Sequence, residues 1–171
     1  MLCPKSGVKT MRELQQMSAA VAAALTERNE NISVSESSTG GLISASLLSV
    51  PGASNYFLGG GVIYTHAARQ ALLGLGEQLP EGMRASTQAY ARLCADTMLT
   101  KMGTTWAIAE TGAAGPTGNR YGDAAGHSVV AVSGPVAQTR VIETRSGDRE
   151  ANMWAFSRAA LELLEHCINE A

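Results

Sequence analysis

A short apolar segment followed by a glycine-rich turn constrains the fold more than any other feature of the sequence. Ile32 and Val34 belong to a brief β-type run, residues 36–41 contain the turn, and residues 42–48 have helical spacing of apolar side chains. This order is typical of layered α/β domains, in which ligands gather where strands end and helices begin. We therefore expect residues 36–41 to lie at a ligand-binding end of a sheet. The simpler alternative is that their Ser and Thr residues only cap the following helix.

Helical and strand patterns alternate along the remaining chain. Apolar side chains at three- and four-residue steps, together with capping residues such as Asp148, predict further helices over residues 10–29, 66–73, 84–102 and 149–170. Short apolar runs bounded by Gly and Pro predict strands over residues 59–65, 105–109, 128–132 and 140–144. The order αβαβααβββα, without repeats or a linker, predicts an α/β fold with a sheet of mixed direction, covered by helices on both faces.

Length and charge restrict the class of protein. The chain has 171 residues, with 13 basic and 15 acidic side chains and a formal net charge of −2. Since one domain has about 100–200 residues, we expect a single domain over residues 1–171, with residues 1–9 as a flexible N-terminal extension. Without a basic excess or an apolar stretch of about 20 residues, neither nucleic acid nor a membrane is an expected partner. The start lacks the apolar centre of a signal peptide, which predicts a cytoplasmic protein.

The three cysteines, Cys3, Cys94 and Cys167, are expected to form neither a disulfide nor a metal site. They are odd in number, far apart and without CxxC spacing, which argues against a disulfide framework and against structural zinc. Cys94 and Cys167 lie in segments with helical apolar spacing, so we expect both in the core.

A second glycine-rich segment, residues 111–126, follows the strand predicted over residues 105–109. Gly and Pro recur throughout it, so it cannot form a regular helix, and structureless loops of this length are usually functional or disordered. It lacks the Gly-Lys-Ser/Thr of a Walker A loop, and the first strand lacks a GxGxxG fingerprint. Because both glycine-rich segments follow strands, we expect them to meet at one end of the sheet and to frame a single pocket. The alternative is a wide connection without function.

Six short segments occur in an order and spacing that span nearly the whole chain: residues 36–41, 51–54, 61–65, 72–74, 111–116 and 146–149. Together they resemble the CinA C-terminal domain family, the nicotinamide mononucleotide deamidases also called PncC. The resemblance implies a three-layer α/β/α sandwich, a homodimer and hydrolysis of the carboxamide of nicotinamide mononucleotide to nicotinate mononucleotide and ammonia, with no metal or organic cofactor. In many relatives this domain follows a pyrophosphatase domain, for which 171 residues leave no room, so we expect the stand-alone form.

The resemblance also implies roles for single residues. Ser37 corresponds to a serine that is nucleophilic or otherwise essential. Tyr64 corresponds to a tyrosine that donates a proton or stacks on the pyridine ring, and Thr111 to a threonine that positions the carboxamide or the ribose. Arg149 would hold the substrate phosphate by paired hydrogen bonds. Free N–H groups beside Ser37 would stabilise the developing oxyanion. The substrate-binding residues expected in this way are Thr39, Gly40, Gly41, Arg69, Gly112, Gly115 and Arg149.

Several positions depart from the family pattern. Arg69 stands where the family has a lysine, and because arginine does not lose its proton it cannot act as a general base. His66 replaces a family asparagine, and a histidine ordinarily titrates near neutral pH, so we predict that it is the substitute base and therefore catalytic, together with Ser37, Tyr64 and Thr111. Ser38 replaces a family cysteine, a mild exchange if the side chain only packs. Asp123 adds a negative charge beside the expected pocket.

These departures leave three functional hypotheses. The first is an amidohydrolase that acts on nicotinamide mononucleotide or a close nucleotide relative. The second is a catalytically silent homologue that still binds a pyridine nucleotide, which the loss of the family lysine at Arg69 favours. The third is an amidase with a different substrate, which the altered segment over residues 117–125 favours.

Overall fold

The described residues form one mixed sheet of five strands. The computed structural model describes residues 10–76 and 79–171, so the extension predicted over residues 1–9 lies outside the described residues. β1 pairs in parallel with both β2 and β3, whereas the pairs β3–β4 and β4–β5 are antiparallel. The predicted sheet of mixed direction is therefore confirmed. The strand order is β2-β1-β3-β4-β5, with β1 (Ile32–Glu36), β2 (Phe57–Val62), β3 (Trp106–Ala113), β4 (His127–Ser133) and β5 (Gln138–Glu143).

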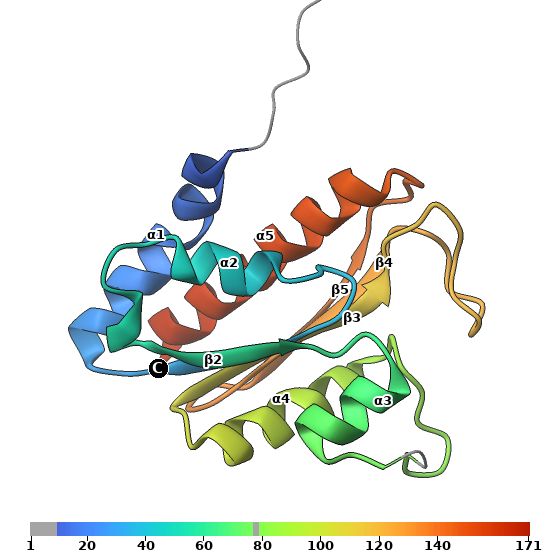
Figure 1. Ribbon diagram of the computed structural model, residues 1–171, viewed down its shortest axis with the longest axis horizontal. Helices are drawn as coiled ribbons and strands as arrows, with labels where there is room; N and C mark the ends of the chain where they lie inside the picture. Colours follow the sequence, from blue (N-terminus) through green and yellow to red (C-terminus); the bar gives the residue numbers. More distant parts are fainter. Residues whose placement is uncertain (1–9, 77–78) are drawn as a thin grey trace, which may run out of the picture.

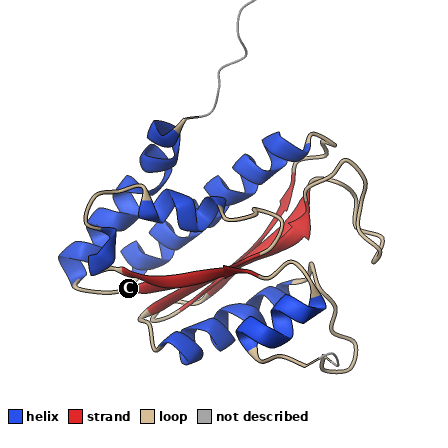
Figure 2. Cartoon of the chain, in the orientation of Figure 1, coloured by secondary structure: helices blue, strands red, loops and turns tan. Residues whose placement is uncertain are grey.

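Helices cover both faces of the sheet (Figure 1). One helical layer contains α1 (Met11–Arg28), α2 (Leu42–Leu48) and α5 (Arg149–Glu170). The other contains α3 (His66–Ala68), the π-helical turn η2 (Arg69–Leu73) and α4 (Gln88–Met102), while a short 3-10 turn, η1 (Ala53–Asn55), precedes β2. Figure 2 shows helices above and below the strands, which confirms the predicted three-layer α/β/α sandwich. No helix in the described part of the chain combines the length and hydropathy that crossing a membrane requires.

The sheet separates two apolar cores. Every residue of β1 and nearly every residue of β3 is buried, because strands in the middle of such a sheet are covered on both faces. One core contains Trp106 of β3 with Leu25 of α1 and Leu164 of α5. The other contains Ala107 of β3 with Met98 of α4. In the sequence β3 therefore begins as a continuous apolar run, whereas β1 alternates apolar residues with the buried serines Ser33 and Ser35.

Cys94 and Cys167 lie in these cores, as predicted. Cys167 belongs to the core under α5 and Cys94 to the core under α4, and both are free thiols. Burial raises the pKa of the Cys94 thiol to about 11, so this side chain stays protonated near neutral pH and is a poor nucleophile. Cys3 lies outside the described residues.

Strand β3 is longer than predicted, which moves the start of the second glycine-rich loop. The prediction placed Thr111 in the loop, whereas β3 continues to Ala113 and pairs with β4 from Ala107 onward. Gly112 permits this pairing because a Cβ at its position would lie 2.5 Å from the carbonyl oxygen of His127. Glu110, Thr111 and Gly112 are thus held on a strand, and the loop proper comprises residues 114–126.

Helix α4 begins later than predicted. It starts at Gln88 rather than at Arg84, because the Thr87 hydroxyl caps the helix by accepting a hydrogen bond from the N–H group of Tyr90 (3.3 Å). The preceding Ser86 has a left-handed backbone conformation, with φ of 61°, which a right-handed helix cannot include. Residues 84–87 therefore form a separate segment in front of the helix.

Two other elements differ in their limits. Strand β2 covers Phe57–Val62 instead of residues 59–65, and the helix predicted over residues 66–73 consists of α3 followed by η2. The Thr65 hydroxyl accepts a hydrogen bond from the N–H group of Ala68 (3.1 Å). This cap begins a helix where the prediction still had a strand.

Both glycine-rich segments lie at the same end of the sheet (Figure 1). Residues 37–41 follow β1 and residues 114–126 follow β3, and these two strands are parallel neighbours. The longer loop is closed at its base by a hydrogen bond from the Gly126 N–H group to the Ala113 carbonyl (2.8 Å). Near its tip, the Asn119 N–H group donates to the Asp123 carbonyl (3.0 Å).

Candidate functional site

Two adjoining hollows lie where these segments meet. The larger measures about 310 Å³ and the smaller about 220 Å³. The sequence predicted a single pocket, but Tyr64, Gly112 and Asn119 contribute to the walls of both hollows and so divide the space in two. Most of the predicted site residues are brought together here. Some of the predicted residues line one hollow only. The larger hollow has Ser37, His66, Arg69 and Thr111, and the smaller has Gly115 and Arg149.

A buried carboxylate, Glu110 of β3, holds the turn that follows β1. This side chain is 3% exposed. Its Oε2 accepts hydrogen bonds from the N–H groups of Ser37 (3.1 Å) and Thr39 (3.0 Å). Its Oε1 accepts from the hydroxyls of Ser38 and Ser128, the latter at 2.8 Å. Glu110 therefore ties the serine-bearing turn to the central strand and satisfies polar groups that are shielded from water.

A second buried carboxylate, Glu36 at the end of β1, holds the start of α2. Its two oxygens accept hydrogen bonds from the N–H groups of Gly41 (3.0 Å), Ile43 (3.1 Å) and Ser44 (3.1 Å). N–H groups in the first turn of a helix have no partner within the helix. Glu36 supplies that partner from inside the protein.

Thr39, Gly40 and Gly41 were predicted to bind substrate, but they line neither hollow. The Thr39 hydroxyl lies between the two buried carboxylates, 2.8 Å from Glu36 and 3.1 Å from Glu110. The N–H groups of all three residues donate to acceptors within the protein. The N–H groups expected to be free for a ligand are thus engaged, and these residues shape the turn from inside.

The two serines of the turn have different surroundings. Ser37 contributes to the larger hollow, and its hydroxyl has no hydrogen-bond partner within residues 10–76 and 79–171. Ser38 contributes to the smaller hollow and donates its hydroxyl to Glu110, so it does more than pack. Its N–H group is the one N–H of residues 37–41 that meets no acceptor in the described chain. Ser37 therefore offers a free hydroxyl and Ser38 a free N–H group.

His66, the predicted general base, lies beside Arg120 on the wall of the larger hollow. Nη2 of Arg120 is 2.6 Å from Nε2 of His66. Because a guanidinium group only donates, this ring nitrogen is the acceptor and the neutral ring carries its proton on Nδ1. The structure therefore directs the His66 lone pair at Arg120, and it forms no hydrogen bond between His66 and Ser37.

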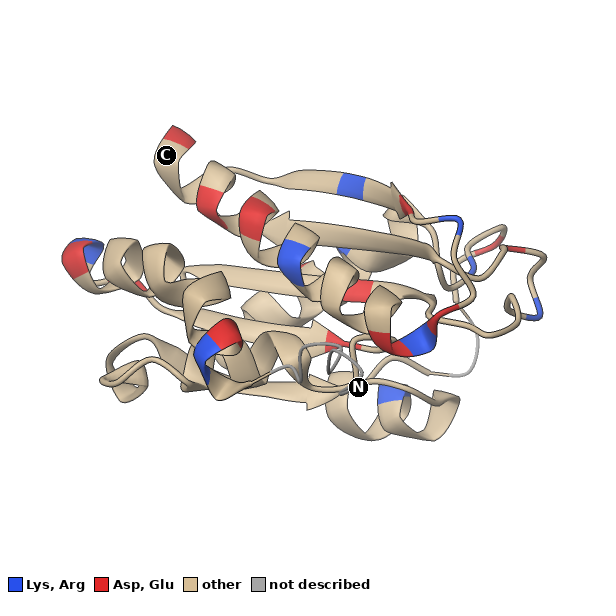
Figure 3. Ribbon diagram, turned by 90° about the horizontal axis from the view of Figure 1, so that it is seen from above, with Lys and Arg blue, Asp and Glu red and all other residues tan. Residues whose placement is uncertain are grey.

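Arginines supply the charge of the hollows. Arg69 is 3% exposed and donates to a backbone carbonyl at 2.7 Å. Arg149, the first residue of α5, donates to the Gly115 carbonyl (2.7 Å) and to the Tyr64 hydroxyl (3.3 Å). With Arg120, three arginines contribute to the walls, and no described Asp or Glu does so. Elsewhere acidic and basic residues are interspersed (Figure 3). The hollows are thus suited to an anionic ligand.

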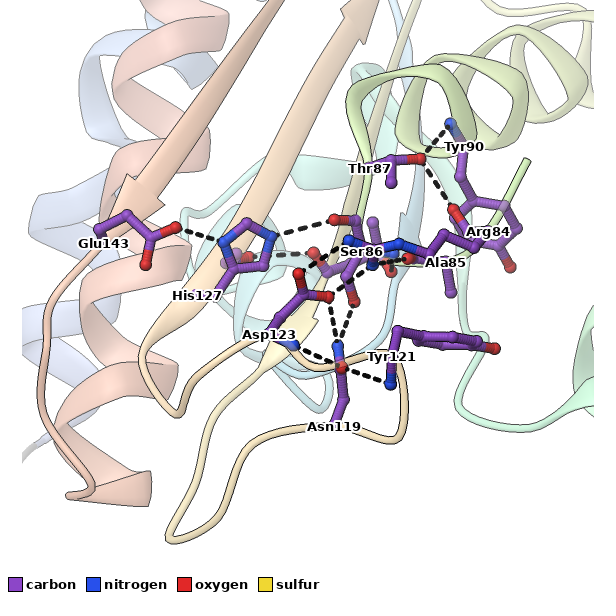
Figure 4. A network of polar contacts seen from close by, with 12 residues as sticks. Arg84, Ala85, Ser86, Thr87, Tyr90, Asn119, Tyr121, Asp123, His127 and Glu143 are labelled. Carbon is purple, nitrogen blue, oxygen red and sulfur yellow. Dashed lines mark hydrogen bonds and ion pairs between the residues drawn. The ribbon is translucent and has the colours of Figure 1, made fainter. Parts of the chain in front are cut away.

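The negative charge of Asp123 is neutralised by a residue that the sequence analysis missed, Arg84 (Figure 4). The Arg84 guanidinium donates to both carboxylate oxygens of Asp123, at 2.6 and 2.9 Å. This hydrogen bonding, with a further contribution from Asn119, holds the pKa of Asp123 below its usual value. The negative charge of Asp123 therefore stays inside an ion pair and does not repel an anion from the larger hollow.

Glu110 was missed as well, although the sequence contained a signal for it. It is an acidic residue within a strand that is otherwise apolar or small, directly before Thr111. Buried carboxylates are rare unless they are paired or hydrogen-bonded, so an acidic residue in such a strand indicates a specific polar contact. For a metal ion, by contrast, the described residues offer no group of three or more His, Cys, Asp or Glu side chains placed to hold one.

The fold and the hollows define a class of protein, an α/β/α domain with a serine-bearing turn and two adjoining hollows at the carboxyl ends of parallel strands. The comparison with known families is specific: the chain belongs to the CinA C-terminal domain family, whose profile matches residues 14–168. Two crystal structures have closely similar folds. A CinA superfamily protein from Klebsiella pneumoniae 700603 has a TM-score of 0.85 at 26% identity and covers 92% of this chain and 99% of its own. The competence/damage inducible protein CihA from Agrobacterium tumefaciens has a TM-score of 0.83 at 26% identity and covers 96% and 99%.

Curated relatives have the same family name. A CinA-like protein from Synechocystis sp. is 36% identical over 146 residues, which are 85% of this chain and 35% of the relative. A CinA-like protein from Gloeobacter violaceus is 32% identical over 151 residues, which are 86% of this chain and 35% of the relative. The chain thus spans about a third of the length of these curated relatives.

Proposed function

We propose that this protein hydrolyses the carboxamide of nicotinamide mononucleotide, giving nicotinate mononucleotide and ammonia. The observation that carries the proposal is Ser37, whose hydroxyl has no hydrogen-bond partner among the described residues. It lines a hollow in which arginines are the charged side chains that the structure describes. An amide-bearing nucleotide has both groups that such a site recognises, an electrophilic carbon for the serine and a phosphate for the arginines. Family membership and the six matching segments support the same reaction.

In this proposal the turn supplies both the nucleophile and the oxyanion donor. The Ser37 oxygen attacks the amide carbon, and the N–H group of Ser38 stabilises the negative charge that develops on the amide oxygen. The C–N bond then breaks, and the nitrogen leaves as ammonia with the proton that the base took from Ser37. Water hydrolyses the resulting ester, which releases nicotinate mononucleotide and restores the Ser37 hydroxyl. Arg149 uses two of its five N–H donors on Gly115 and Tyr64. Its remaining donors hold the phosphate in the smaller hollow, and Thr111 positions the carboxamide or the ribose in the larger one.

The serine proton needs an acceptor, and His66 on the wall of the larger hollow is the first candidate. If His66 is the base, Arg120 must release its Nε2 when substrate binds. Replacing His66 with glutamine is then expected to abolish ammonia release while nucleotide affinity changes little, because the variant loses only the proton acceptor. Steady-state kinetics with an ammonia assay, and calorimetry with nicotinate mononucleotide, measure the two effects separately. Near-normal turnover in this variant excludes His66 and makes Glu110, which accepts hydrogen bonds from the Ser37 N–H group and the Ser38 hydroxyl, the next candidate base.

A silent nucleotide-binding homologue is the second candidate, because Arg69 is buried, donates to a backbone carbonyl and cannot accept a proton. The decisive experiment incubates the purified protein with nicotinamide mononucleotide and measures ammonia and nicotinate mononucleotide. Equal amounts of both products support the deamidase. Nucleotide binding without ammonia supports the silent homologue, and ammonia from another amide alone supports an altered substrate.

A further inference from the structure

His127, the first residue of β4, is the centre of a polar network behind the larger hollow (Figure 4). It lies directly opposite Glu143 of β5, and its Nδ1 hydrogen-bonds to the Glu143 carboxylate. Its Nε2 lies 3.0 Å from the backbone carbonyl oxygen of Ser86. A carbonyl and a carboxylate only accept hydrogen bonds, so both ring nitrogens must carry a proton to form both contacts. The geometry therefore describes an imidazolium ion.

Ser86 connects this imidazolium to the hollow. Its side chain is buried, and its backbone has a φ of 61°, a conformation that non-glycine residues rarely adopt without support. Its N–H group donates to the Thr111 hydroxyl (3.2 Å), and its own hydroxyl accepts from the side-chain amide of Asn119 (3.1 Å). Thr111 and Asn119 both line the larger hollow. Ser86 thus has His127 on one side and two hollow-lining side chains on the other.

The other ties between these segments do not change charge near neutral pH. Arg84 and Asp123 form a two-point ion pair, and the Asn119 amide also donates to Asp123 (2.8 Å). Arginine keeps its proton throughout this range, and the pKa of Asp123 is lowered by Arg84. Of the groups in this network, His127 is the one whose ordinary pKa falls in the neutral range.

We infer that His127 is a positioning residue of the site: its doubly protonated ring holds Ser86 in the left-handed conformation and thereby sets the Thr111 hydroxyl and the Asn119 amide in the larger hollow. When the ring loses a proton, the remaining one stays with Glu143, and the Nε2 lone pair then faces the Ser86 carbonyl oxygen. Two acceptors at 3.0 Å repel each other, so Ser86 is released. That this release weakens the binding of the nucleotide and slows its deamidation rests on the proposed function. The coupling of His127 to Ser86 does not.

The groups that face His127 determine the direction of its titration. Burial lowers the pKa of His127, but the hydrogen bonds to Glu143 and to the Ser86 carbonyl, with the charges of Glu143 and Asp123, outweigh it and raise the pKa above its usual value. In the unfolded chain the pKa of a histidine is about 6.5. Because the folded-state pKa of His127 is higher, its charged ring stabilises the fold fully below about pH 6.5, and this stabilisation is lost as the pH rises through the folded-state pKa. The arrangement is therefore complete in mildly acid solution and is lost on the alkaline side.

Nuclear magnetic resonance on the protein alone tests the coupling. We expect the His127 ring signal and the backbone amide signals of Ser86 and Thr111 to titrate with one common midpoint. Replacing Glu143 with glutamine removes the charge beside the ring and should move this common midpoint to lower pH. Replacing His127 with glutamine should abolish the titration of both amides. His166, an exposed histidine of α5 that pairs with Glu170 at 3.2 Å, is the matched control, and His166→Gln should leave the titration unchanged.

Ligand binding gives the second readout. Between about pH 6 and about pH 9, the affinity for nicotinate mononucleotide should fall by a larger factor in the unchanged protein than in His127→Gln. We expect the two factors to differ about fivefold or more, which is a typical size for the coupling of two equilibria. Ser86 and Thr111 signals without an inflection at the His127 midpoint, or the same pH dependence in His127→Gln as in the unchanged protein, would overturn the inference. Failure of the proposed reaction appears differently, as absent ammonia at every pH while the amides still follow His127.

Discussion

Replacement of Ser37 by alanine is expected to reduce ammonia release from nicotinamide mononucleotide by about a thousandfold or more, the scale on which loss of a nucleophile acts. The hydroxyl has no partner in the described chain, so its removal breaks no hydrogen bond of the fold. The Ser37 N–H group remains bound to Glu110. Affinity for the nucleotide and the thermal midpoint should therefore change little, and the loss should appear in kcat.

A matched control for this experiment is Ser49→Ala. Ser49 lies at the other end of α2, and its hydroxyl donates to the Ser46 carbonyl (2.6 Å). Ammonia release by this variant should stay within about twofold of the unchanged protein, as for a substitution away from the chemistry. If Ser37→Ala retains comparable activity, attack by the Ser37 oxygen is excluded and an activated water becomes the attacking group.

Replacement of Glu110 by alanine should give the largest loss of stability, about 3 kcal/mol or more, because several buried donors lose their acceptor together and each costs about 1–3 kcal/mol. The donors left behind include the N–H groups of Ser37 and Thr39 and the hydroxyl of Ser128. Urea unfolding followed by circular dichroism measures the loss. The turn should also lose its fixed position, so ammonia release should fall in the fraction that stays folded.

Two serines separate the structural part of this effect from the functional part. Ser38 and Ser128 each donate a hydroxyl to the same Glu110 oxygen, but only Ser38 contributes to a hollow. We expect Ser38→Ala and Ser128→Ala to destabilise the fold to a similar extent, and only Ser38→Ala to change the kinetics. Glu162→Ala, at an exposed position of α5, should alter the unfolding free energy by about 0.5 kcal/mol or less. A loss as small as this in Glu110→Ala contradicts the role assigned to that carboxylate.

Local patterns predicted most of the architecture. The helix over residues 10–29 and the final helix after Asp148 have apolar steps and capping residues, and the structure places α1 and α5 there. The strand containing Ile32 and Val34 is also where it was predicted. Errors occurred where a cap or a close backbone approach outweighed the apolar pattern, as at Thr87 and at Gly112.

The site was harder to predict because its contacts join residues that are distant in sequence. Ser37 and Glu110 are 73 positions apart, and Arg84 and Asp123 are 39 apart. A single sequence shows each residue with its local preference but not which distant group satisfies it. Motifs therefore located Ser37, Tyr64 and Thr111 around the hollows, whereas the carboxylate and imidazolium that hold these walls became visible only in the folded chain.

The loop over residues 114–126 has a consequence for the thermodynamics of recognition. Its base is closed between Gly126 and Ala113, and its tip is held by Asn119 and Asp123. The conformational entropy of this long segment is therefore lost when the chain folds, not when a ligand enters. A ligand that meets such a preorganised wall keeps more of its contact energy as affinity. Exchanges along the loop that preserve these closing bonds can then retune which ligand is accepted while the surrounding fold stays unchanged.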